Sequence, residues 1–210
     1  EDSRQDINMT QYEKHTLPRD EETLENIEAS MHAGANAMVC SALVSSVVEE
    51  MQKKGIVLAA PRSPYGFSGT REWLKGIADA LGLHLDTAIR KLEDRYIEDF
   101  ERLKTRLKGK KIFVSGGPGR LIGLLHILAD FEMDIQAAAL FWPHPNSQRD
   151  INHLLEQHHI TMHEIIVSPS LYELEEISQK YSFDLWLGGY QEQHTCKIQD
   201  IPFVPITVYT

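Results

Sequence analysis

The sequence is poor in cysteine, in positive charge and in long apolar runs. Only two of its 210 residues are cysteines, Cys40 and Cys196, and neither belongs to a CxxC pair, so their spacing predicts no zinc site. No run of eighteen apolar residues occurs, which argues against a membrane span. Lysine and arginine number 21 against 31 aspartates and glutamates, giving a net charge of -10. Nucleic-acid partners are not expected, because phosphate binding needs a basic patch.

The two ends of the sequence carry little targeting information. The N-terminal run EDSRQDINMTQYEK is polar and charged and does not have the pattern of a signal peptide. Two distant thiols without such a signal predict a reducing, cytoplasmic location. The sequence starts without Met and finishes on an apolar run, IPFVPITVYT, which favours a fragment of a longer protein. A hydrophobic fraction of 42% is enough for a sizeable core.

The first half of the sequence predicts a linker followed by a partial domain. Residues 1–15 show no hydrophobic period and are interpreted as a linker or the edge of an absent domain. Residues 16–108 are interpreted as a partial α/β domain ending in a long helix. Its predicted helices are 20–31, 44–54, 71–81 and 85–107, and its strands are 35–43 and 56–60. Gly55 and Gly82 are expected to end helices, and Thr70 is expected to cap one.

Residues 109–210 alternate regularly between strand and helix patterns. The predicted strands are 111–115, 135–142, 163–167, 183–187, which a turn follows, and 202–208. The predicted helices are 121–131, 149–158, 168–181, capped by Ser168 or Ser170, and a short one ending near 198. Such alternation is typical of βαβ units, so we expect Rossmann-like parallel sheets with helices on both faces, in two subdomains joined by the long helix 85–107.

The loop after the strand 111–115 is the first candidate site. It reads SGGPGR, and its glycines Gly116, Gly117 and Gly119 would let backbone approach a ligand closely. The following helix N-terminus favours an anion, and Arg120 adds a fixed positive charge. No GK[ST] follows, and the third glycine of the GxGxxG dinucleotide motif is missing. Ligand contact and a plain tight turn both remain open.

Three further places could carry chemistry. Gly188 and Gly189 directly follow the strand 183–187, where a simple turn is the competing interpretation. In the loop 61–70, Tyr65, Gly66, Ser68 and Thr70 could line a pocket, and the competing interpretation of Thr70 is a helix cap. Cys40 falls near a strand-to-helix junction, where a thiolate could ligate iron or simply be a small buried side chain.

The ten histidines do not form a recognisable metal motif. His144, His153, His158, His159 and His163 crowd one stretch, but none of them makes the i, i+4 pair of a helical zinc site. We interpret them as mostly solvated. His194 and Cys196 stand two apart on a predicted helix and would point in different directions, so a shared metal is not expected.

Three runs together carry a family resemblance. They are GIVLAAPRSPYGFSGTREWLKGIADALG, LKGKKIFVSGGPGRLIGLLHILADFEMDI and FDLWLGGYQEQHTCKIQDIPFVPI. In order and spacing they resemble the nitrogenase component 1-type oxidoreductases, over about residues 17–208. The resemblance implies three stacked Rossmann-like domains per subunit, with parts of the later two present here. It also implies an iron-sulfur-type metallocluster or a tetrapyrrole bound between domains.

The resemblance also implies partners and site residues. Homologous component 1 subunits pair as homo- or hetero-oligomers, and an ATP-dependent iron-sulfur reductase supplies electrons. Cys40 lies about one residue from the cofactor-facing cysteine of the family, and Gly116, Gly117 and Arg120 match its Gly-Gly-x-Arg loop, with Gly119 as an extra residue. The cysteines that hold the bridging cluster have no counterpart, GIV replaces the usual GIP, and the cofactor-anchoring histidine would fall beyond Thr210.

The sequence therefore predicts part of a nitrogenase component 1-like oxidoreductase subunit. It would provide scaffold and part of a metallocluster or tetrapyrrole site, and the isolated fragment is expected to be inactive. Two alternatives stay open. One is a non-catalytic scaffold module that carries a cofactor, and the other is a Rossmann-like domain that binds a nucleotide.

Overall fold

The computed structural model describes residues 25, 28–29, 31–37, 45–60, 64–145 and 147–206. The chain divides into two compact units, residues 1–33 and 34–210. In the first unit, residues 25, 28 and 29 are helical, in line with the predicted helix 20–31. Among the described residues, no helix has both the length and the apolar character needed to cross a membrane.

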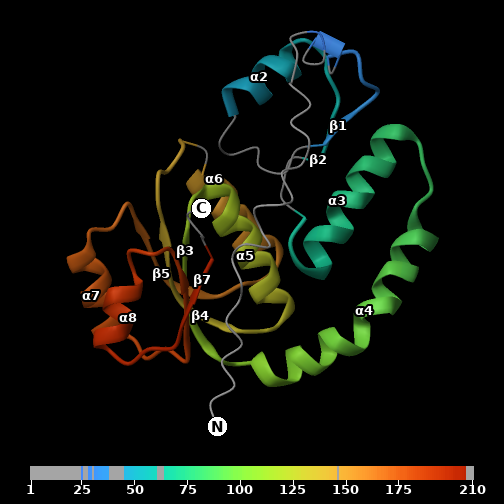
Figure 1. The fold of residues 1–210 in the computed structure, drawn as a ribbon. Coiled ribbons are helices and arrows are strands. Elements are labelled where there is room, and N and C mark those ends of the chain that lie inside the picture. The colour runs from blue at the N-terminus through green and yellow to red at the C-terminus, as the bar shows by residue number, and fades with distance from the viewer. Residues whose placement is uncertain are drawn as a thin grey trace, which may run out of the picture. The chain divides into compact units, whose positions relative to one another are not determined.

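A five-stranded parallel sheet organises the second unit (Figure 1). Its strand order is β5-β4-β3-β6-β7, so the chain starts at the centre, adds two strands on one side and then two on the other. The strands are β3 (Lys111–Gly116), β4 (Asp134–Leu140), β5 (Met162–Val167), β6 (Leu185–Gly188) and β7 (Phe203–Pro205). The connecting helices are α5 (Pro118–Asp130), α6 (Ser147–Gln157), α7 (Leu171–Lys180) and α8 (Gln193–Ile198).

The sheet has a hydrophobic core on each face. Along β3, Ile112 and Val114 join the core that includes α5 and α6, whereas Phe113 joins the core that includes α7 and α8. Successive side chains of a strand point to opposite faces, which is why an unbroken apolar run fits a strand covered on both sides. The expected Rossmann-like parallel sheet with helices on both faces is confirmed.

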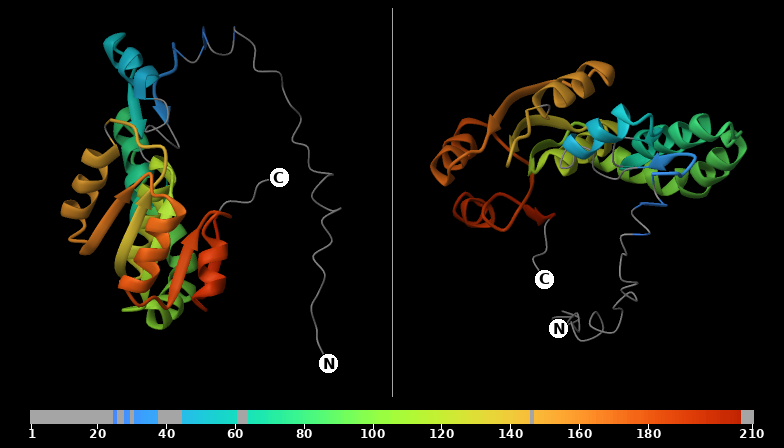
Figure 2. Two further views of the ribbon diagram at one scale, coloured as in Figure 1. Left: turned by 90° about the vertical axis from the view of Figure 1, so that its left-hand side faces the viewer. Right: turned by 90° about the horizontal axis from the view of Figure 1, so that it is seen from above.

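The region before this sheet is smaller and more helical. A two-stranded parallel sheet pairs β1 (Asn36–Ala37) with β2 (Leu58–Ala60). The helices are α2 (Ser45–Lys53), α3 (Gly66–Leu81) and α4 (Asp86–Leu107), the last of which ends shortly before β3 (Figure 2). Gly55 and Gly82 follow α2 and α3 with positive φ of 74° and 64°, as predicted for helix ends. The predicted domain boundaries at residues 15 and 108 stay predictions.

Two local predictions about helix starts are wrong. Helix α3 begins at Gly66 rather than after Thr70, and the Thr70 hydroxyl donates a hydrogen bond of 3.1 Å to the Pro64 carbonyl. Thr70 is therefore a residue of the second turn, whose side chain ties the helix to the loop before it.

Helix α5 begins at Pro118, so Gly119 and Arg120 belong to its first turn. Proline favours the first helical position because its fixed φ suits a helix and its missing N–H is not needed there. The sequence offered Ser168 or Ser170 as the N-cap of α7, and in the structure the N-cap is Ser170.

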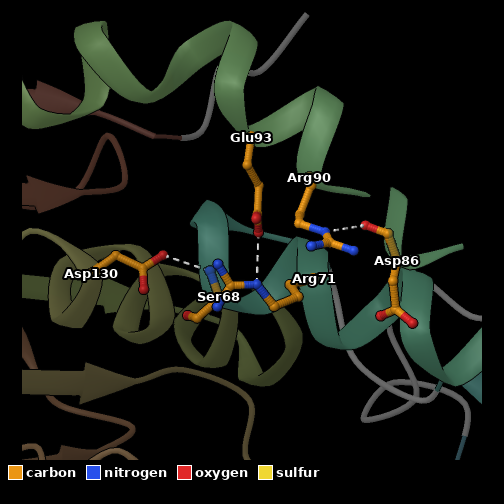
Figure 3. A network of polar contacts seen from close by, with 6 residues as sticks. All are labelled: Ser68, Arg71, Asp86, Arg90, Glu93 and Asp130. Carbon is orange, nitrogen blue, oxygen red and sulfur yellow. Dashed lines mark hydrogen bonds and ion pairs between the residues drawn. The ribbon is translucent and has the colours of Figure 1, made fainter. Parts of the chain in front are cut away.

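Polar contacts connect α3 to α4 and to α5 (Figure 3). Arg71 on α3 donates to Glu93 on α4 at 2.6 Å, and the Ser68 backbone N–H donates to Asp130 at the end of α5 at 3.0 Å. At the other end of α4, Lys104 and Lys108 both pair with Glu132, which follows α5. These contacts hold α4 beside the sheet layer, although α4 itself has few buried side chains.

Candidate functional site

The topological switch point of the sheet lies at the carboxyl ends of β3 and β6. The chain leaves β3 toward one side, to β4, and leaves β6 toward the other, to β7. In an open α/β sheet, the crevice at such a point is the usual place for ligands. A cavity of about 50 Å³ lies there. It is lined by Ser115, Gly116, Gly117, Arg120, Phe141, Trp142, Gly189, Tyr190, Gln191, Glu192 and Ile206.

Two buried polar residues that line this cavity, Ser115 and Glu192, are hydrogen-bonded to each other. Ser115 at the end of β3 is fully buried and Glu192 just before α8 is 1% exposed. The Ser115 hydroxyl donates a hydrogen bond to Oε1 of Glu192. A buried carboxyl group is costly unless it is hydrogen-bonded, so this contact fixes the turn after β6 against the neighbouring strand.

Gly188 is required by the same contact. A Cβ on Gly188 would stand 3.0 Å from the Ser115 hydroxyl and 3.2 Å from the carboxyl carbon of Glu192. Any larger side chain would therefore push the pair apart. Close packing at the strand end therefore explains why this position is a glycine. That reason is more specific than the simple turn that the sequence suggested.

The start of α5 supplies the positive side of the cavity. Gly117 is the N-cap residue, with φ -69° and ψ 166°, and Pro118 follows it. Arg120 is exposed and forms no ion pair with another described residue. A helix N-terminus and an unpaired guanidinium both favour a negatively charged group.

The structure brings together four of the predicted site residues. Gly116, Gly117, Arg120 and Gly189 line one cavity, although β3 and β6 are far apart in sequence. Gly119 is buried in the first turn of α5, and Gly188 lies behind the Ser115–Glu192 pair, so neither lines the cavity. Cys40 lies outside the described residues.

Other lining residues were not among the predicted site residues, although Ser115, Tyr190, Gln191 and Glu192 belong to the two predicted glycine loops. Glu192 is the glutamate of the run Gly189-Tyr190-Gln191-Glu192, and Trp142 comes at the end of the β4 run. The glutamate three residues after a strand-end glycine was the available signal. It became informative only once β3 was known to be the neighbour of β6.

Cys196 is unsuited to metal ligation in this structure. It lies on α8 and is 1% exposed, whereas His194 on the same helix is exposed. Burial, with the nearby Glu192 as a smaller cause, raises the pKa of the Cys196 thiol to about 12. The thiol therefore stays protonated at neutral pH, and the expectation that Cys196 and His194 point apart agrees with their different exposure.

A second, more apolar cavity of about 410 Å³ lies among α3, α4 and α5. Gly66 and Thr70 line it as the sequence suggested, while Tyr65 and Ser68 do not. Three phenylalanines line it: Phe67 on α3, Phe100 on α4 and Phe131 directly after α5. The tilted rings of Phe67 and Phe100 have centroids 4.4 Å apart, and the stacked rings of Phe100 and Phe131 have centroids 5.1 Å apart.

The described histidines range from exposed to fully buried. His153, His159 and His163 are exposed, as predicted. The prediction is wrong for His158, whose side chain is only 17% exposed because the end of α6 places it against α3 and α5. His126, which the sequence did not flag, is 1% exposed on α5.

Comparison with known proteins gives one consistent result. The chain matches the family of nitrogenase component 1 type oxidoreductases over residues 7–209. It is 26% identical over 199 residues to the nitrogenase iron-molybdenum cofactor biosynthesis protein NifE of Sinorhizobium fredii, which covers 90% of this chain and 39% of that protein. It is 26% identical over 149 residues to the nitrogenase molybdenum-iron protein alpha chain of Methanothermobacter marburgensis, covering 69% and 31%.

The fold agrees with that result. The solved structure of nitrogenase Cp1 at pH 6.5 superposes with a TM-score of 0.75 at 18% identity, covering 87% of this chain and 40% of that one. The chain thus spans about a third to two fifths of the length of these relatives: 39% for NifE, 31% for the alpha chain and 40% for the solved structure. From the match across residues 7–209, the chain belongs to the nitrogenase component 1-type oxidoreductase family.

Proposed function

We propose that the carboxyl edge of β3 and β6 forms one wall of a metallocluster or tetrapyrrole site in a component 1-like oxidoreductase. The observation that supports this most is the glycine-lined cavity at the switch point, with Arg120 on its rim and Glu192 held in place by Ser115. Ligands of an open α/β sheet bind at this edge, and close backbone approach needs the glycines.

The residues fit contact with such a group better than ligation of it. About 50 Å³ is far below the roughly 300–1,000 Å³ of ligand pockets, so this edge cannot enclose a cofactor by itself. Among the described residues that line the cavity, Glu192 is the one side chain that commonly ligates metals, and its carboxyl is engaged by Ser115. Arg120 and the backbone N–H groups at the start of α5 would stabilise negative charge on a bound group.

Ligands to a metal would then come from other parts of the protein. Cys40 remains our proposed cofactor-facing ligand from this chain. When bound, a metallocluster or tetrapyrrole would supply the redox chemistry. The residues at this sheet edge would position the bound group and set the electrostatic potential around it.

The partners and location belong to the same proposal. We expect pairing with a homologous component 1 subunit, electron delivery by an ATP-dependent iron-sulfur reductase, and a cytoplasmic location. The relatives include proteins named as alpha and beta chains, which supports the first of these.

A cofactor-carrying scaffold without turnover is the second candidate. It is supported by the two NifE relatives, which match 90% and 85% of this chain and are named for cofactor biosynthesis. A scaffold would use the same wall to hold a cofactor and release it to another protein.

Anaerobic reconstitution separates these candidates. The complete gene product that contains this chain is incubated with iron and sulfide, or with a tetrapyrrole, and followed by visible and electron paramagnetic resonance spectra. We expect a bound chromophore. Turnover with a supplied reductase and ATP identifies the oxidoreductase, and binding without turnover identifies the scaffold. If neither kind of cofactor binds, the proposal is wrong.

A further inference from the structure

Three potential metal ligands meet where α3, α5 and the end of α6 come together. Glu72 is on α3, His126 is on α5, and His158 directly follows α6. One ligand atom from each lies within 4.8 Å of those from the other two. None of the three lines the cavity at the sheet edge, so this cluster is separate from the proposed cofactor wall.

Burial decreases across the cluster from the histidines to the carboxylate. His126 is 1% exposed, while the side chains of His158 and Glu72 are 17% and 40% exposed. The two imidazole rings meet edge to face, with centroids 4.6 Å apart. The helices therefore hold two imidazoles together, and the carboxylate stands on the side toward solvent.

The spacing of His158 and Glu72 suits two ligands of one ion. Nε2 of His158 lies 3.5 Å from Oε1 of Glu72. This nitrogen is buried and makes no hydrogen bond to any described residue. A good N–H···O bond would be about 2.7–3.2 Å. Two ligands of a tetrahedral zinc ion, each bonded at about 2.0–2.1 Å, stand about 3.3 Å apart.

We propose that Glu72, His126 and His158 bind a divalent transition-metal ion, for which Zn²⁺ is the best match. Two imidazoles and one carboxylate are a known zinc donor set that leaves a fourth position for water, and the exposed side of Glu72 gives water access. Such an ion would cross-link α3, which precedes the long helix α4, to α5 and α6, which follow it.

Metal binding to the purified chain tests this inference. The 210-residue chain is produced without a histidine tag, stripped with a chelator and titrated with Zn²⁺ against a chromophoric chelator. We expect about one equivalent to bind, and Co²⁺ to give the intense visible bands of a tetrahedral site, because three protein ligands and one water form a four-coordinate centre.

Variants of the two more exposed ligands locate the ion without disturbing the core. Glu72→Gln and His158→Asn are each expected to weaken Zn²⁺ binding by more than about 100-fold, the upper end of what loss of an outer-shell partner costs. The matched controls Glu156→Gln and His153→Asn change exposed residues of α6 and should bind as the parent chain does. Circular dichroism confirms that each variant is folded.

Three results would overturn the inference. They are no stoichiometric binding by the parent chain, unchanged binding in both ligand variants, or equal loss in the controls. The first would leave His126 and His158 as packing residues beside an acidic neighbour, and the last would indicate adventitious binding to surface histidines. None of these results bears on the cofactor wall, because the two clusters share no residue.

Discussion

Helices α5 and α4 are adjacent in sequence and are buried to very different extents. Nine of the 13 residues of α5 are buried, whereas Ile89 is the buried residue of the 22-residue α4. Helix α5 packs its apolar side chains against β3 and β4, while α4 is attached through a cluster of three phenylalanines and a set of ion pairs. The sheet layer therefore has a core of its own, and α4 depends on a few contacts.

The composition of the two helices explains this difference. PGRLIGLLHILAD is apolar nearly all round, which suits a helix between a sheet and other helices. DTAIRKLEDRYIEDFERLKTRL is highly charged, with its apolar residues on one stripe. Part of that stripe, including Leu92, Tyr96 and Leu103, lines the 410 Å³ cavity rather than a closed core.

The largest expected effect compares the cores directly. Leu125→Ala on α5 removes a fully buried side chain and should lower the free energy of unfolding by about 2–5 kcal/mol. Leu103→Ala on α4 removes a side chain that is 41% exposed and should cost about 1 kcal/mol or less. Urea unfolding followed by circular dichroism measures both. Equal losses would contradict the view that the sheet layer carries most of the stability.

The next largest effect is expected from glycine-to-alanine substitutions at the carboxyl edge of the sheet, which test how tightly that edge is packed. Gly188→Ala should cost about 1–3 kcal/mol, because its Cβ would crowd the Ser115–Glu192 pair. Gly116→Ala is the matched control, since it also ends a strand and its Cβ would meet nothing closer than the Leu121 backbone nitrogen at 3.5 Å. The same unfolding experiment applies. A Gly188 variant as stable as the control would show that this edge is loosely packed.

A smaller effect concerns the attachment of α4. Arg71→Gln removes the 2.6 Å contact from α3 to Glu93, whose side chain is 20% exposed, and should cost about 0.2–1 kcal/mol. The control Arg102→Gln breaks an exposed pair within α4 and should cost about 0.5 kcal/mol or less. Hydrogen exchange of α4 amides would reveal local loosening, and unchanged exchange in the Arg71 variant would mean that the ion pair with Glu93 does not help to hold α4.

The smallest expected effect is a titration at the end of α4. Hydrogen bonds from Lys104 and Lys108 lower the pKa of Glu132 from the usual 4.5 to about 2. Because the folded pKa is the lower one, the stabilisation is complete above pH 4.5 and is lost as the pH falls through about 2. Carboxyl chemical shifts in NMR spectra report this pKa directly. A normal value would show that both lysines are solvated and that this end of α4 is not fastened.

The sequence was most informative where strands and helices alternate. The run KIFVSGGPGRLIGLLHILAD led to a strand, a turn and a helix, and the structure has all three. It erred at helix starts, because proline at the first position of α5 and the loop contact of Thr70 are decided by backbone geometry rather than by composition.

The candidate site could be predicted only in part, for a related reason. Glycines at strand ends are visible in sequence, so Gly116, Gly117 and Gly189 were found. The Ser115–Glu192 pair joins residues 77 apart, and the group of Glu72, His126 and His158 draws on three helical segments. Such pairings depend on strand order and helix packing, which local spacing does not encode.

The spectrum of the reconstituted complete protein in an Arg120→Gln variant tests the proposed wall most directly. Arg120 is exposed and contacts no acidic partner among the described residues, so the substitution should leave the fold intact. If this edge faces the cofactor, its occupancy should fall or its visible and electron paramagnetic resonance spectra should shift, while an Arg102→Gln control matches the parent. Identical occupancy and spectra in all three proteins would contradict the account.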